Sequence, residues 1–275
     1  MSILIERTAL ALFAIAPLIA WSQESASDEI SSERAARLAV MQKIVGEYSM
    51  TIGSSEEMVT LRESPVLRFS NPIRLAADGG MFLWEHDGRP VALTCVFPSG
   101  VGLWDHEFQS LSDRPLVARR GIRTVWSPAA AIRFTDVPKA SAPPFTAPAR
   151  RREMGTISRR FTARMLGWGE GKRKDDELRM LASPIHRWGD PKGEVVDGGM
   201  FLFGEATDPE VALVLEAHRV EEVLIWKYAL ARVTTAELAV RIDNEIVWSI
   251  PPWDFQSRPN EPYLTIFKQL APKLK

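Results

Sequence analysis

The stretch Asp-Gly-Gly-Met-Phe-Leu occurs twice in this chain, at Asp78–Leu83 and at Asp197–Leu202. Displacing the sequence by 119 residues aligns Ser64–Trp84 with Ser183–Phe203 without a gap, and ten of these 21 positions are identical. A displacement of 122 residues aligns Trp104–Ser127 with Trp226–Ser249. Loops can absorb the difference of three residues at little cost. The sequence therefore predicts two tandem copies of one structural unit.

Each copy is expected to begin with a helix. Met41, Ile44 and Tyr48 have the spacing of one apolar helix face, and they match Met154, Ile157 and Phe161 at a displacement of 113 residues. The first helix is predicted from the serines at 31 and 32, which can cap it, to Gly46, and the second from about Thr146. The predicted organisation is a first unit at 31–128, a Pro/Ala-rich linker at 129–149, a second unit at 150–251 and a tail at 252–275.

Strands are predicted for most of the remainder of each unit. Met81–Trp84 and Val91–Phe97 flank Asp87-Gly88, a strong hairpin signal, and both strands are apolar enough to be covered on both faces. Asp78-Gly79-Gly80 is predicted as a turn, and Ala206–Glu210 as the hairpin loop of the second copy. We expect a mainly β (α+β) fold with two tandem copies of a helix-plus-antiparallel-strands unit, sandwich-like in form. A separate sheet for each copy and one sandwich shared across a pseudo-twofold axis both satisfy the pattern.

The N-terminus has the features of an export signal. Arg7 precedes the apolar run Ala9–Trp21, which is short for a membrane span, and small polar residues follow it. A signal peptide at 1–27 predicts an exported protein (periplasmic, cell envelope or extracellular) with no stable membrane span after cleavage. An uncleaved anchor is the alternative. The net charge of −1 gives no indication of nucleic acid as a partner, and the single cysteine, Cys95, is expected to be a small buried hydrophobe.

The most suggestive polar cluster is Trp104-Asp-His-Glu-Phe108. On a strand, Asp105 and Glu107 share one face and His106 takes the other. Two carboxylates at i and i+2 can ligate a cation or share acid and base roles, so Asp105, His106 and Glu107 are the catalytic candidates. The second copy has Lys227-Tyr-Ala229 at this position, so the polar set belongs to one copy only. A solvated strand face with one histidine packed on aromatic rings is the competing interpretation.

Outside this cluster, the candidates for ligand binding are Trp84, the neighbouring His86 and Trp168, because exposed aromatic rings can stack on a sugar. Burial in the core is the competing explanation for the tryptophans. No two histidines have metal-ligand spacing, so no metal site is predicted, and no pattern specifies a cofactor. Arg68 and Arg187, which recur in the repeat, are expected to form cation–π contacts or buried ion pairs. Common nucleophile, phosphate-binding and zinc-protease motifs do not occur in the sequence.

Several motifs together resemble a family of uncharacterised exported proteins of planctomycete bacteria. They are His106–Ser112, the two Asp-Gly-Gly-Met-Phe-Leu boxes, Thr207–Glu210, Tyr228–Arg232 and Glu261–Tyr263. The likeness covers most of the chain after the predicted signal. It implies export and common ancestry, and it assigns no substrate, cofactor or catalytic residue.

Three functional hypotheses follow. The first is an exported β-rich binding or interaction module of the cell envelope, with a polysaccharide or an envelope protein as partner. The second is a carboxylate- or metal-dependent hydrolase that uses the Asp105-His106-Glu107 cluster, which requires these side chains to converge in a cleft. The third is a purely structural envelope component. The sequence does not identify a ligand or a reaction.

Overall fold

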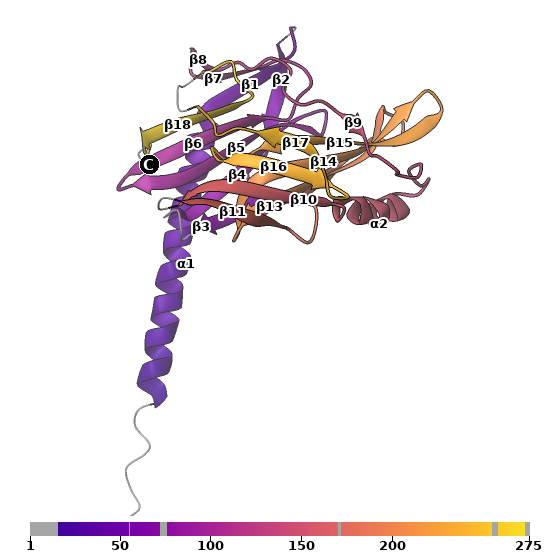
Figure 1. Ribbon diagram of the computed structural model, residues 1–275. Coiled ribbons are helices and arrows are strands. Elements are labelled where there is room, and N and C mark those ends of the chain that lie inside the picture. Colours follow the sequence, from indigo (N-terminus) through magenta and orange to yellow (C-terminus); the bar gives the residue numbers. More distant parts are fainter. Residues whose placement is uncertain (1–15, 55, 72–75, 170–171, 255–257, 273–275) are drawn as a thin grey trace, which may run out of the picture. The chain divides into compact units, whose positions relative to one another are not determined.

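The computed structural model describes residues 16–54, 56–71, 76–169, 172–254 and 258–272. The chain divides into two compact units, residues 1–39 and residues 40–275. The strands of both copies lie in the second unit, where antiparallel strands predominate (Figure 1). The predicted mainly β fold is confirmed.

Helix α1 runs from Ala16 to Gly46 and therefore begins before Ser31, where its start was predicted. Its last residues, which belong to the second unit, bury Met41, Ile44 and Val45. Residues 1–15 of the predicted signal peptide lie outside the described residues, so its cleavage and role in export stay predictions. Among the helices that are described, none is long and apolar enough to cross a membrane.

The strands of the first copy follow α1. They are β1 (Tyr48–Ile52), β2 (Glu57–Leu61), β3 (Leu67–Asn71), β4 (Ala76–His86), β5 (Arg89–Gly100), β6 (Leu103–Ser110), β7 (Leu116–Arg120) and β8 (Arg123–Trp126). The turn of the β4–β5 hairpin is Asp87-Gly88, as predicted, and both residues have positive φ. Strand β5 is buried over most of its length, because apolar side chains cover both of its faces.

The second copy repeats this order. Short strand β9 (Thr135–Asp136) precedes α2 (Ala147–Ser158), whose N-cap is Thr146 and whose Met154 and Ile157 are buried. The strands that follow are β10 (Phe161–Gly169), β11 (Lys172–Met180), β12 (His186–Trp188), β13 (Val195–Glu205), β14 (Asp208–Val220), β15 (Val223–Arg232), β16 (Glu237–Ile242) and β17 (Glu245–Ile250). Strand β18 (Tyr263–Leu270) lies in the predicted tail.

The two sheets have the same strand order. The first is β18-β6-β5-β4-β2-β1-β7-β8 with β3 beside β4, and the second is β9-β15-β14-β13-β11-β10-β16-β17 with β12 beside β13. Strand β9, which follows the first copy in sequence, pairs with β15 of the second copy, and β18, which follows the second copy, pairs with β6 of the first. The copies therefore exchange their outermost strands.

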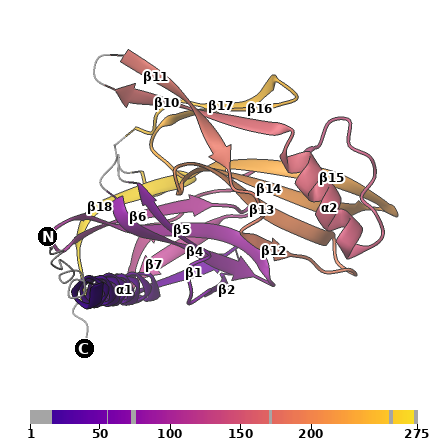
Figure 2. The same ribbon diagram turned by 90° about the horizontal axis from the view of Figure 1, so that it is seen from below.

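Three apolar clusters make up the core of the second unit. One lies within the first copy around Phe82, Phe108 and Trp126, and one within the second around Phe201, Phe203 and Trp226. The third joins the two sheets, with Leu83 and Leu93 from the first copy packed together with Leu202 and Val214 from the second. Figure 2 shows the strands of the two copies as neighbouring layers. The copies thus share one central core in addition to their own.

The repeated Asp-Gly-Gly box is not a turn, contrary to the sequence-based prediction. It lies within β4 in the first copy and within β13 in the second. A Cβ on Gly79 would lie 2.3 Å from the Phe69 ring, and one on Gly198 would lie 2.3 Å from the Trp188 ring. The glycines are therefore required for close packing of an aromatic ring on the strand rather than for positive φ.

The repeated Asp and Arg residues form ion pairs across neighbouring strands. Arg68 Nε donates to Asp78 Oδ1 at 3.0 Å, and Arg187 Nη2 donates to Asp197 Oδ1 at 2.6 Å. In the second copy Arg150 of α2 also donates to Asp197, at 3.0 Å, and both of these side chains are almost fully buried. These contacts confirm the ion-pair alternative for Arg68 and Arg187.

Candidate functional site

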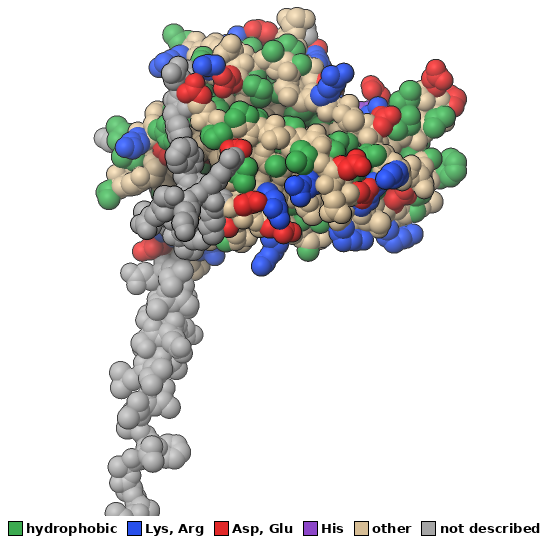
Figure 3. Space-filling view, in the orientation of Figure 1, with side chains coloured by type: hydrophobic (Ala, Val, Ile, Leu, Met, Phe, Trp, Pro, Cys, Tyr) green, Lys and Arg blue, Asp and Glu red, His purple; other side chains and the backbone are tan. Residues whose placement is uncertain are grey.

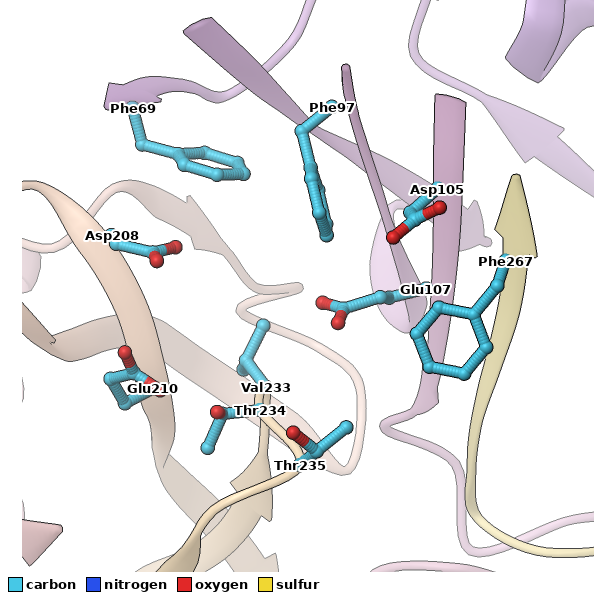
Figure 4. A pocket seen from close by; sticks show the side chains of 10 residues that line it. All are labelled: Phe69, Phe97, Asp105, Glu107, Asp208, Glu210, Val233, Thr234, Thr235 and Phe267. Carbon is cyan, nitrogen blue, oxygen red and sulfur yellow. The ribbon is translucent and has the colours of Figure 1, made fainter. Parts of the chain in front are cut away.

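A cavity of about 190 Å³ lies where the ends of strands from the two copies meet (Figure 4). The residues that line it are Phe69, Phe97, Asp105, Glu107, Asp208, Glu210, Val233, Thr234, Thr235 and Phe267. We call this cavity the acidic pocket, because four of these side chains are carboxylates and none is basic. Asp105 and Glu107 lie on one wall, and Asp208 and Glu210 lie on the opposite wall.

The first wall belongs to β6. Its alternation places Asp105 and Glu107 on the same face, as predicted. Asp105 is 8% exposed and accepts a hydrogen bond from the backbone N–H of Lys268 at 2.7 Å. Glu107 accepts one from the hydroxyl of Tyr263, also at 2.7 Å. The exchanged strand β18 therefore holds both carboxylates in position.

The second wall is the beginning of β14. Asp208 accepts a hydrogen bond from the Asn71 side-chain amide at 3.0 Å, and Glu210 is fully buried. The sequence predicted Ala206–Glu210 as a loop, but the turn is only Ala206-Thr207, since Glu205 already pairs with Asp208. Asp208 and Glu210 are therefore strand residues that share a face.

Aromatic rings complete the pocket. Phe69 and Phe97 meet edge to face with their centroids 6.2 Å apart. Phe267 of β18 is 42% exposed. The pocket thus combines anionic groups with aromatic rings, which is the combination that attracts organic cations.

The negative charge of the pocket acts on the thiol behind it. Burial raises the pKa of Cys95 well above its ordinary value, and Glu107, Asp208 and Glu210 raise it further by repulsion of the thiolate. Cys95 is accordingly a neutral buried side chain, as the sequence predicted.

The pseudo-equivalent place, which both copies also build together, is electrically balanced. Arg89 stands there at the position of Asp208, and Glu216 stands at the position of Phe97. The Arg89 guanidinium donates to both carboxylate oxygens of Glu216 at 2.8 Å and lies over the Phe134 ring at 5.1 Å. Trp188, the counterpart of Phe69, also donates to Glu216 at 2.9 Å.

Lys227 and His218 also contact acidic side chains at this place. Lys227, at the position of Asp105, pairs with Asp136 of β9 at 2.5 Å. His218 contacts Glu216 at 2.7 Å. Burial alone would raise the pKa of Glu216, but the contacts with His218 and Arg89 outweigh it and lower the pKa. Cations from both copies, Arg89 of the first and Lys227 of the second, therefore lie at this place, where the acidic pocket has Asp208 and Asp105.

His106 does not belong to the acidic pocket. Its ring is fully buried on the other face of β6, where Nδ1 lies 2.7 Å from the Tyr48 hydroxyl. Burial, together with repulsion from Arg120, lowers the pKa of His106 to about 4. Of the three catalytic candidates, the structure brings Asp105 and Glu107 together and separates His106 from them.

The candidates for ligand binding also lie elsewhere. Trp84 is 2% exposed and donates to Thr94 at 2.9 Å, so it presents no ring to a sugar. His86 lies 2.9 Å from Glu57 and does not line the acidic pocket. Trp168 is on β10, and its side chain lies outside the described part of the chain.

Within the described part of the chain, no group of three or more His, Cys, Asp or Glu side chains is arranged to hold a metal ion.

Basic side chains gather where α2 lies (Figure 3), and Arg151, Arg152 and Arg159 are exposed there. Arg150 of the same basic run is buried against Asp197.

Sequence reasoning missed Asp208 and Glu210. The available signal was a second Asp-x-Glu pattern, Asp208-Pro-Glu210, of the same form as Asp105-His-Glu107. The proline and the expected loop concealed it, although proline is tolerated at the first residues of a strand.

Comparisons with known proteins do not identify a family. No family model matches the chain, and neither a curated protein nor a solved structure is significantly similar to it.

Proposed function

We propose that this chain is a binding module whose acidic pocket takes a cationic group, an ammonium or a guanidinium, carried by a partner molecule. Together with the predicted export signal, this makes an exported binding module of the cell envelope the favoured function.

One observation carries the proposal. At the pseudo-equivalent place, the Arg89 guanidinium pairs with the carboxylate of Glu216 and lies over the Phe134 ring. The acidic pocket has Asp208 where the other copy has Arg89. A cation from outside would bring to the acidic pocket the positive charge that Arg89 of the first copy brings to Glu216 of the second.

The side chains that line the acidic pocket favour a cationic ligand. Burying a charge is costly unless the charge is paired and hydrogen-bonded. Asp105, Glu107 and Asp208 offer carboxylate oxygens to a cation, and charge-assisted hydrogen bonds are about twice as strong as neutral ones. Phe97 and Phe267 add ring faces and edges within the same small volume.

The hydrolase hypothesis is the alternative. It keeps Asp105 and Glu107 in one pocket, but His106, its third residue, lies on the other face of β6 with Tyr48. Asp105 and Glu107 each accept a hydrogen bond from β18, which favours a positioning role for that strand in either hypothesis.

Calorimetric titration of the full chain with arginine amide, lysine amide and citrulline amide tests the proposal. Citrulline replaces the guanidinium by an uncharged urea of the same shape. We expect binding of one or both cations and none of citrulline, and a loss of about tenfold or more in affinity for Asp105→Asn and for Asp208→Asn.

The matched control is Asp136→Asn, which neutralises an exposed carboxylate paired with Lys227 in the other copy. This variant should leave the affinity unchanged. Equal binding of citrulline, or cation binding that survives both pocket variants, would contradict the proposal. A calcium-dependent response that requires the same carboxylates would favour the metal alternative instead.

A further inference from the structure

A second cavity, of about 160 Å³, lies between strands of both copies and the tail of the chain. It is lined by Gln109, Ala131, Leu230, Ala231, Arg232, Trp248, Ile250, Trp253, Glu261, Pro262 and Tyr263. We call it the tryptophan pocket. The Tyr263 ring lines it, and the Tyr263 hydroxyl reaches out of it to Glu107 of the acidic pocket.

Gln109 lines the tryptophan pocket and carries a buried acceptor without a partner in the part of the chain that the structure describes. The side chain is 4% exposed, and its Nε2 donates to the Ser110 carbonyl at 2.7 Å. Its Oε1 has no hydrogen-bond partner among the described residues. Buried amide oxygens are rarely left in this state, so the arrangement favours a ligand that donates a hydrogen bond.

Arg232 contributes a donor. It is 6% exposed, and burial lowers the pKa of its guanidinium. Its Nε donates to the Thr234 carbonyl at 2.8 Å, and its Nη2 donates to the carbonyls of Ala236 at 2.7 Å and Pro251 at 3.3 Å. Within the described part of the chain, Nη1 makes no hydrogen bond. The guanidinium is thus fixed in place with one nitrogen left for a ligand.

The formal charges and the aromatic side chains around the tryptophan pocket indicate which class of ligand it fits. Arg232 and Glu261 balance each other in formal charge around the cavity, which favours an uncharged ligand. Trp248, which is half-buried, supplies accessible aromatic surface, whereas Trp253 and Tyr263 are 5% and 2% exposed and only bound the cavity. A cavity of about 150 Å³ holds a single benzene ring, so this cavity has room for one six-membered ring.

We propose that the tryptophan pocket binds one neutral sugar ring. A hydroxyl group both donates and accepts, so a single sugar can accept from Arg232 Nη1 and donate to Gln109 Oε1. The apolar C–H face of the ring packs on the Trp248 indole. This site is separate from the acidic pocket and does not depend on the cation proposed for it.

Saturation-transfer NMR on the full chain tests this site, with glucose, galactose, mannose and N-acetylglucosamine as ligands and glucuronate as the charged comparison. We expect transfer to at least one neutral sugar. Gln109→Leu should weaken its binding by about tenfold, because the variant removes the acceptor and gives up only the contact with Ser110. Trp248→Ala should weaken it as well.

Two controls separate the outcomes. Ile246→Ala on the same strand, at a side chain that is 59% exposed and does not line the cavity, should bind the sugar as the unmodified chain does. Asp105→Asn should also leave sugar binding intact, even though it is expected to abolish cation binding. No transfer from any neutral sugar at tens of millimolar, transfer unchanged by Gln109→Leu and Trp248→Ala, or a preference for glucuronate would each overturn the proposal.

Discussion

Asp208 and Arg89 occupy the same position in the two copies, and this difference in charge, together with that between Asp105 and Lys227, distinguishes the two places where the copies meet. Arg89 is held by Glu216 in a bidentate ion pair, and that geometry is the most specific that a guanidinium adopts with a carboxylate. Asp208 instead faces Asp105 and Glu107 across a cavity. The duplicated fold thus provides one place with an ion pair between the copies and one with an acidic cavity.

His106 was a catalytic candidate in the sequence, but in the fold it is a buried side chain that packs against Tyr48. Its Nδ1 shares a hydrogen bond of 2.7 Å with the Tyr48 hydroxyl, and its ring lies edge to face with the Tyr48 ring. The pKa of Tyr48 is raised to about 12, chiefly by burial, so the hydroxyl keeps its proton at any pH at which the fold is studied.

The burial of His106 should make the free energy of unfolding depend on pH. The pKa of His106 is about 4 in the folded protein and 6.5 in the unfolded chain. The folded state therefore binds fewer protons between these values. The stabilisation is complete above pH 6.5 and decreases as the pH falls toward 4, by roughly 3 kcal/mol in total.

Urea unfolding from pH 7 to pH 4 measures this effect when the chain is compared with His106→Gln, which keeps an acceptor for Tyr48 but does not titrate. We expect the difference in the free energy of unfolding between the two proteins to change by roughly 3 kcal/mol over this range. Parallel curves for the two proteins would show that His106 does not titrate as described.

At the scale of elements, the pairing of β3 with β4 and of β12 with β13 depends on the glycines of the repeated box. Gly79 in β4 lies against Phe69 of β3, and Gly198 in β13 lies against Trp188 of β12. The next glycine of each box, Gly80 or Gly199, lies against the sulfur of Met41 or Met154. A repeated box of two glycines therefore admits an aromatic ring on one face and a helix methionine on the other.

Gly79→Ala should therefore destabilise the fold by about 2 kcal/mol, because the new methyl group would overlap the Phe69 ring. In a Phe69→Leu background the same substitution should cost clearly less, since the ring is gone. Urea unfolding of the four proteins in this cycle gives the coupling energy between the two positions.

Gly155→Ala in α2 is the matched control, because only the flexible end of Arg159 lies near its Cβ position, at 3.7 Å. This substitution should stabilise the protein by up to about 1 kcal/mol, since alanine is the better helix former. If both alanine substitutions had the same sign, packing against Phe69 would not be the reason for the glycine.

At the scale of the whole second unit, the exchange of outer strands joins the two copies. Strand β18 follows the second copy in sequence but pairs with β6 and supplies Tyr263 and Leu264 to the core of the first copy. The same strand positions Asp105 and Glu107. The acidic pocket is therefore complete only when both copies and the tail are present.

We expect that residues 1–128, produced alone, will not unfold cooperatively. This fragment lacks β18 and exposes the face that Leu83 and Leu93 present to the second copy. Mixing it with residues 129–275 should restore a cooperative transition in circular dichroism. A cooperative transition for the 1–128 fragment by itself would contradict a shared core.

The sequence by itself determined the features that depend on neighbours along the chain. The duplication, the Asp87-Gly88 hairpin, the start of α2 at Thr146 and the shared face of Asp105 and Glu107 all follow from local spacing and turn chemistry, and the structure agrees with them. Export and the resemblance to a planctomycete family stay predictions.

Only the tertiary structure decided which distant residues meet. Asp105 and Asp208 are more than a hundred positions apart, and they face each other because two sheets pack through one core. Strand β18 and the short β9 escaped prediction because pairing partners on the other copy, and not their own sequences, hold them in place. Periodicity fixes the direction of a side chain from its own strand, but packing between sheets determines what lies opposite to it.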